Sequence, residues 1–175
     1  MKTAFCKVVL ICVLLTSVSI AQENTTEQTL QKAGYLLSVE SSRLKILRTD
    51  LSKIRKKNMA LNGLDNPQMF HITLLIENIF LAETICAYES LLLKTLDNLE
   101  ENKKLEQYNF HHSRLKEATL KRLYLNFTST QTNIANINDK EILQVADRAK
   151  EEMMIILQHI EGIITILQNQ NRSVQ

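Results

Sequence analysis

Apolar residues recur every three or four positions along most of the chain, which is the spacing of one face of an α-helix. The pattern is clearest near the C-terminal end, where it predicts a helix over residues 139–168. Asn138 precedes Asp139 and Glu141 there, so a capping side chain and acidic groups stand at the positive end of the helix dipole. The apolar stripe of this helix consists of Ile142, Ala146, Ala149, Met153, Ile156, Ile160, Ile163 and Leu167.

A similar stripe predicts a first helix that ends near Arg55 or continues to Leu61. Ser41 occupies the one position of this stripe where the spacing calls for an apolar residue and a polar one stands. Cations in "KIRKKN" suit its C-terminal end, and "ALNGLDNPQ" breaks it because Gly63 permits a left-handed turn and Pro67 restricts the residue before it. The stripe consists of Leu30, Ala33, Leu37, Leu44, Leu47, Leu51 and Ile54.

Two further helices are predicted between these. One runs from Gln68 to about Asn102 and is apolar on more than one face, as a central helix of a bundle would be. The other runs over about 106–127. The segment "NFTSTQTNIANIND" that follows has no helical stripe and is rich in Thr and Asn, so it predicts a loop.

Four helices and no strand pattern predict an all-α fold, namely one four-helix bundle. If the first helix ends at Arg55, residues 56–68 reach ~43 Å and can return along a helix ~38 Å long. Residues 127–138 have a similar reach of ~40 Å. These connections allow an up-up-down-down order, which we expect. A simple up-down-up-down bundle is the alternative, and it is favoured if the first helix continues to Leu61.

Residues 1–21 are predicted to be a cleaved secretory signal peptide. Lys2 and Lys7 precede an apolar run from Val8 to Val18 that is too short to span a bilayer. Ser19-Ile20-Ala21 then has the small-x-small pattern of a signal-peptide cleavage site. A retained signal anchor is the alternative. Residues 22–175 then form one secreted, extracellular domain that is not inserted in a membrane.

Loss of the two leader lysines lowers the 21 basic residues to 19, which equals the 19 acidic ones. A chain with no net positive field gives no reason to expect nucleic acid as a partner. The outer face of the last helix carries Asp147, Glu151 and Glu152, and the chain has no Trp, which lowers the expectation of membrane-surface binding.

Cysteine usage excludes a disulfide framework. Cys6 and Cys12 leave with the leader, so Cys86 has no partner within the mature chain. We expect Cys86 to be a buried, unpaired thiol. A thiol that joins two chains and a reactive nucleophile are the alternatives. Three sequons make Asn24, Asn126 and Asn171 candidates for glycosylation.

No catalytic motif is present, so we expect neither an enzyme nor a cofactor. His71, His111, His112 and His159 lack the spacing of metal ligands. His111 and His112 are interpreted as a solvated pair, with a metal site as the alternative.

Two basic clusters could contact a sulfated glycan or an acidic partner, or could be ordinary solvated helix faces. The first consists of Lys53, Arg55, Lys56 and Lys57, and the second of Arg114, Lys116, Lys121 and Arg122.

Three stretches carry a resemblance to a known family: "LSVESSRLKILRTDLSKI", "CAYESLLLKTLDNLEE" and "AKEEMMIILQHIEGIITILQ". Together with a leader, sequons and a single helical domain, they resemble the long-chain helical cytokines around interleukin-6, interleukin-11 and leukaemia inhibitory factor. Members of that group often carry disulfides, which this mature chain cannot form within itself.

The resemblance implies a secreted glycoprotein of immune signalling that binds and assembles cell-surface cytokine receptors and so triggers intracellular signalling. It also implies docking by the exposed faces of the first and last helices. The receptor-binding candidates are Arg43, Lys45 and Arg48 on the first helix and Arg148, Glu152, Gln158 and His159 on the last. A secreted helical carrier of lipid or of another small apolar ligand is the alternative function.

Overall fold

The computed structural model describes residues 2–63, 67–96, 98–115, 117–135 and 139–173. Side chains are described from Thr29 onwards, except at positions 62, 67, 101–102, 113–118, 170–171 and 173. The helices are α1 (Lys2–Asn62), α2 (Pro67–Leu96), α3 (Glu101–Leu115), α4 (Glu117–Ile134) and α5 (Lys140–Ser173). No strand occurs in the described ranges, so the prediction of an all-α fold is confirmed.

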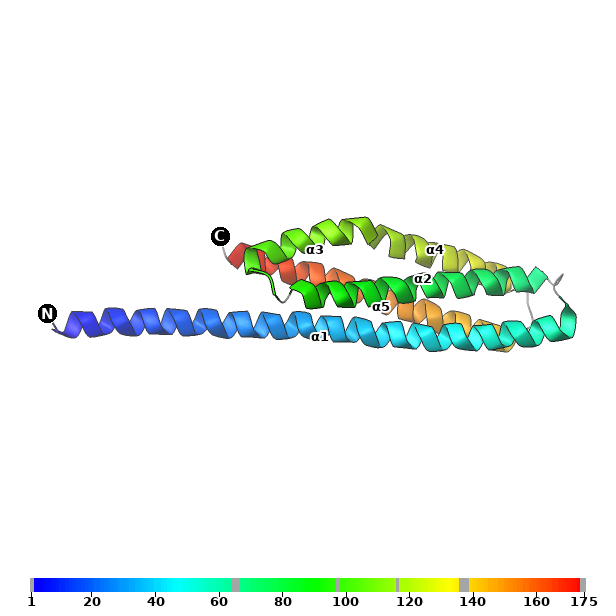
Figure 1. Ribbon diagram of the computed structural model, residues 1–175, viewed down its shortest axis with the longest axis horizontal. Coiled ribbons are helices and arrows are strands. Elements are labelled where there is room, and N and C mark those ends of the chain that lie inside the picture. Colours follow the sequence, from blue (N-terminus) through cyan, green and yellow to red (C-terminus); the bar gives the residue numbers. More distant parts are fainter. Residues whose placement is uncertain (1, 64–66, 97, 116, 136–138, 174–175) are drawn as a thin grey trace.

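The helices lie side by side, and α1 extends beyond the others at its N-terminal end (Figure 1). α1 packs most extensively against α2 and next against α5, while α3 and α4 pack against α2 and α5. The chain reverses between α1 and α2, again between α2 and α3, and again between α4 and α5, whereas α3 and α4 continue in one general direction (Figure 1). The expected up-up-down-down order is therefore not confirmed.

The reason lies at the end of α1, which continues past Arg55 to Asn62. Gly63 has a φ of 75° and donates its backbone N–H to the carbonyl of Met59 at 3.1 Å, which closes the helix with a left-handed residue. Only positions 63–66 separate α1 from α2, and so short a connection cannot return along the bundle.

The predicted loop after residue 127 is wrong, because α4 continues to Ile134. Phe127, Thr130 and Ile134 are buried and extend the stripe of Leu120 and Leu123 at helical spacing. The Thr128, Thr130 and Thr132 hydroxyls donate to the carbonyls four residues earlier at 2.8–2.9 Å, so these polar side chains are satisfied within the helix.

The last helix begins within a residue of the predicted start, but its cap is Asp139, whereas the sequence analysis assigned the capping side chain to Asn138. The Oδ1 atom of Asp139 accepts from the backbone N–H groups of Glu141 at 3.0 Å and Ile142 at 3.2 Å, so Asp139 is the capping residue. Asn138 lies outside the described residues. All eight residues of the predicted apolar stripe are buried in the common core.

Candidate functional site

The outer surface along α1 and α5 holds most of the receptor-binding candidates. Arg43 Nη1 on α1 lies 3.7 Å from Glu152 Oε2 on α5, and Lys57 Nζ lies 3.7 Å from Glu141 Oε2. These two ion pairs link the antiparallel helices α1 and α5, and the first brings Arg43 and Glu152 together.

Arg48 belongs to a different surface. Its Nε lies 2.8 Å from Glu83 Oε2 on α2, and its guanidinium lies 5.0 Å from the ring centroid of Phe80. The Arg48 side chain is thus held against α2 by a carboxylate and an aromatic face and is 30% exposed, whereas the Arg43 side chain is 52% exposed. Arg43 and Arg48 therefore contact different neighbours and do not form one patch.

The other candidates divide by exposure. Lys45, Arg148 and Gln158 are exposed. His159 is partly buried, and its Nδ1 has no hydrogen-bond partner among the described residues. Of the seven candidates, Arg43, Lys45, Arg148 and Gln158 thus present side chains to solvent.

Two large apolar side chains that the sequence pattern did not single out lie on the outer face of α1. Tyr35 is 67% exposed and Ile46 is 62% exposed. Both fall outside the buried stripe of α1, and this departure from the helical pattern was the signal that could have found them. Ile46 lies three residues after Arg43 and therefore on a neighbouring part of the same face.

A buried polar layer crosses the core beneath this surface. It consists of Glu40 on α1, Cys86 and Glu89 on α2, and Tyr108 and His112 on α3. His112 Nδ1 lies 2.8 Å from Glu89 Oε1, and the His112 ring stacks on Tyr108 with centroids 5.2 Å apart. His112 is thus a core residue, and its interpretation as half of a solvated pair is wrong.

Glu152 connects this layer to the surface. Glu40 accepts from Arg43 Nη1 at 2.9 Å. Burial and a shared hydrogen bond with Glu40 raise the pKa of Glu152 to about 7, and the opposing attraction of Arg43 does not cancel these effects. Two carboxyls in such contact favour a state in which one of them keeps a proton.

Cys86 is fully buried and unpaired. Burial, together with the carboxylates of Glu40 and Glu89, raises the pKa of its thiol to about 12. Because the thiolate is the reactive form, this thiol is unreactive at neutral pH. In the side chains that the structure describes, no three His, Cys, Asp and Glu groups converge to hold a metal ion.

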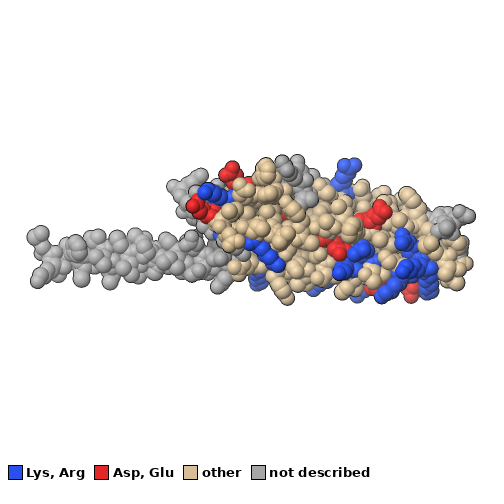
Figure 2. Space-filling model, in the orientation of Figure 1, with Lys and Arg blue, Asp and Glu red and all other residues tan. Residues whose placement is uncertain are grey.

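The first basic cluster lies at the end where α1 meets α5, and Lys and Arg gather at that end of the molecule in Figure 2. Lys53 pairs with Asp50 at 3.1 Å and Lys57 with Glu141, while Lys56 is exposed and Arg55 is partly buried. In the second cluster Lys121 and Arg122 are exposed, and the side chains of Arg114 and Lys116 lie outside the described ones.

Of the three sequon asparagines, Asn126 is exposed on α4. The side chains of Asn24 and Asn171 lie outside those that are described.

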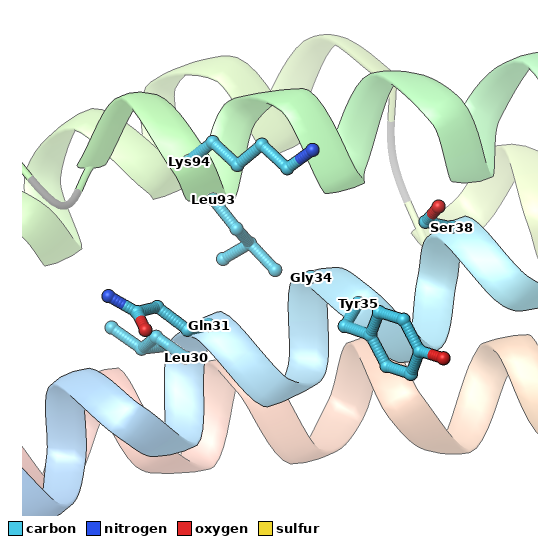
Figure 3. A pocket seen from close by; sticks show the side chains of 7 residues that line it. All are labelled: Leu30, Gln31, Gly34, Tyr35, Ser38, Leu93 and Lys94. Carbon is cyan, nitrogen blue, oxygen red and sulfur yellow. The ribbon is translucent and has the colours of Figure 1, made fainter.

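A surface hollow of about 290 Å³ lies between α1 and α2 (Figure 3). Gly34 stands at its base, and its carbonyl accepts from Ser90 Oγ at 2.8 Å, which ties the two helices together. The hollow is lined by Leu30, Gln31, Gly34, Tyr35, Ser38, Leu93 and Lys94. Its volume is at the lower limit of small-molecule sites, so it does not favour the carrier alternative.

Within the described part of the chain, one helix is long and apolar enough to cross a membrane, over Gln68–Leu96. Only 44% of its most apolar window is buried. A core helix and a membrane span both pass this test, so it is weak support for either.

The described residues form helices and no strand, so the protein belongs to the all-α class. Comparison of the chain with family models, with curated proteins and with solved structures found no match.

Proposed function

We propose that this chain is a secreted helical ligand of cytokine type, which binds the ectodomain of a cell-surface receptor through the outer face of α1 and the adjoining edge of α5. The observation that carries the proposal is the exposure of Tyr35 and Ile46 on one face of α1, with the exposed cations Arg43 and Lys45 on the two opposite flanks of that face. Arg148 extends the surface on α5, one turn before Glu152.

This composition is that of a protein-binding surface. Aromatic residues and arginine are enriched in interfaces, and the residues that dominate binding energy are most often Trp, Tyr and Arg. Tyr35 and Ile46 are ~16 Å apart along α1, so both fit within one receptor contact of standard size. Lys53, Lys56 and Lys57 form a basic surface further along α1 that we propose as a secondary contact for sulfated glycans.

We further propose that the helices form a four-helix bundle of simple up-down-up-down order, in which α3 and α4 together occupy the position of the third helix. The reversals of chain direction support this order (Figure 1). Helical cytokines have an up-up-down-down order instead. The proposed function therefore depends on the predicted leader and on the α1–α5 surface, and not on the helix order.

The test is the binding of the purified secreted protein to cells of its own species, with Ile46→Asp compared with Leu125→Asp. Leu125 is 66% exposed on α4, so its replacement introduces the same charge at the same exposure away from α1. We expect saturable binding that Ile46→Asp weakens at least ~10-fold and Leu125→Asp leaves unchanged. Absence of saturable binding and of receptor signalling, or an equal loss in both variants, would contradict the proposal.

A further inference from the structure

The outer face of α2 carries an apolar stripe that the helices of this chain leave exposed. The α2 stripe consists of Phe70, Leu74, Glu77, Leu81, Thr84, Tyr88 and Leu91. Phe70 is 69% exposed, Leu81 43%, Tyr88 38% and Leu91 61%. The spacing alternates between four and three residues throughout, which is the spacing of a seam that packs against a second helix.

The buried side of α2 is already filled, so the stripe is not part of the core. Ile72, Leu75, Ile79, Cys86 and Leu93 are buried and face the other helices. α2 is thus apolar on both sides but buried on one, whereas a helix that is hydrophobic all round is normally covered all round.

Polar contacts mark the two edges of the α2 stripe. On the α1 side, Arg48 lies over the Phe80 ring and pairs with Glu83. On the α3 side, the hydroxyl of Tyr88 lies 3.3 Å from His111 Nδ1. An apolar centre with a polar rim is the anatomy of a protein–protein interface.

We propose that the occupant of the α2 stripe is the α2 stripe of a second copy of this chain, packed antiparallel about a two-fold axis at Leu81. The stripe is self-complementary in that arrangement. Phe70 then faces Leu91 of the second copy, Leu74 faces Tyr88, and Leu81 faces its own equivalent.

The charge pattern selects the direction of pairing. Glu77 is the only charged residue in the stripe, and in the antiparallel register it faces Thr84. In a parallel pair Glu77 would face Glu77, and two carboxylates in a desolvated seam repel each other.

The available area sets the strength of the dimer. With ~200 Å² for an aromatic side chain, the exposed residues of the stripe and Phe80 offer on the order of 500 Å² per copy, or ~1,000 Å² per pair. That area equals the smallest interfaces regarded as specific, so the dimer is expected to be weak and concentration-dependent. It goes beyond the proposed receptor contact, because it uses α2 and leaves the outer face of α1 open in both copies.

The test is sedimentation equilibrium of the full secreted protein over a wide concentration range, with Leu81→Asp compared with Leu125→Asp. We expect a reversible dimer. Leu81→Asp should raise its dissociation constant at least ~10-fold, because the two-fold axis places the new charge opposite its own copy. Leu125→Asp should change the dissociation constant less than ~2-fold. Circular dichroism verifies that both variants fold. A wild-type protein that is monomeric at all concentrations, or an equal effect of both variants, overturns the proposal.

Disulfide trapping tests the orientation independently, in a Cys86→Ala background. Leu81→Cys should form a covalent dimer on mild oxidation because position 81 meets itself. Thr84→Cys should not, since the two copies of position 84 are offset by ~10 Å along the helices, whereas a parallel pair would be trapped by both variants. Disulfide trapping by Thr84→Cys would overturn the antiparallel dimer. So would a monomeric protein that co-floats with phosphatidylcholine vesicles and loses this binding in Leu81→Asp, because the stripe would then bind lipid.

Discussion

The Nδ1 atom of His112 on α3 lies 2.8 Å from Oε1 of Glu89 on α2, and both residues are buried in the apolar core. This contact joins α2 and α3, which are also linked by Tyr88 and His111 at 3.3 Å nearer the surface. A buried pair of this kind contributes little net stability compared with apolar residues of the same volume, but breaking it leaves an uncompensated charge.

Removal of one partner should therefore cost more than removal of both. We expect His112→Ala to lower the free energy of unfolding by about 3–5 kcal/mol, because Glu89 then stays buried without its partner. The double variant Glu89→Leu/His112→Leu should be more stable than His112→Ala. Urea unfolding at one pH measures both. A double variant no more stable than His112→Ala would contradict an unpartnered Glu89 as the cause of the loss.

Glu152 predicts a pH dependence of stability. Its pKa in the folded protein is about 7, raised by burial and by Glu40 from an ordinary 4.5, while Arg43 opposes the shift. The folded state then binds the proton more tightly than the unfolded state between these values, so stability falls as pH rises from about 4.5 to about 7. Urea midpoints at pH 5 and pH 8 should differ less in Glu152→Gln than in wild type. Glu161→Gln, on the exposed side of α5, is the control and should retain the wild-type difference.

Cys86 predicts slow thiol chemistry. With the pKa of the thiol raised to about 12 and no exposed surface, a thiol reagent should label the native protein only as fast as the protein opens. Labelling should become rapid in denaturant. In a Cys86→Ala background, Leu125→Cys should label rapidly in the native state, which verifies the reagent. Rapid native labelling of Cys86 itself would contradict its burial.

The two glycines of the α1–α2 hairpin should respond in opposite directions. At Gly34 a Cβ would lie 3.5 Å from Leu93 Cβ, an ordinary contact, so Gly34→Ala should stabilise the helix by about 0.5–1 kcal/mol. At Gly63 the φ of 75° disfavours any side chain, so Gly63→Ala should destabilise by roughly 1–2 kcal/mol. Thermal unfolding of both variants provides the measurement. If Gly63→Ala were neutral, the left-handed end of α1 would be wrong.

Particular residues show what the sequence could predict. All eight residues predicted for the α5 stripe from Ile142 to Leu167 are buried, because apolar residues recur along one helix face at regular spacing, although Val145 beside that stripe is also buried and was not predicted. The end of α4 was missed because Thr128, Thr130 and Thr132 are typical of loops, although here their hydroxyls bond back within the helix.

The candidate surface was less predictable, since it depends on which helices are neighbours. Arg43 and Arg48 are five residues apart, yet one contacts α5 and the other α2. The burial of His112 likewise follows from the position of Glu89 across the core. Such cross-helix partners are set by packing between elements, and a periodic pattern within one element carries no information about them.

The short connection at Gly63 has a consequence for the order of folding. α1 and α2 are consecutive, antiparallel and the most extensively packed pair, so their contacts close a small loop and carry little entropic cost. We expect this hairpin to form while the rest of the chain is still being synthesised. α5 follows the other four helices in this sequence and packs on α1 and α4, so the apolar sides of these two helices stay open to solvent, and prone to aggregation, until α5 docks.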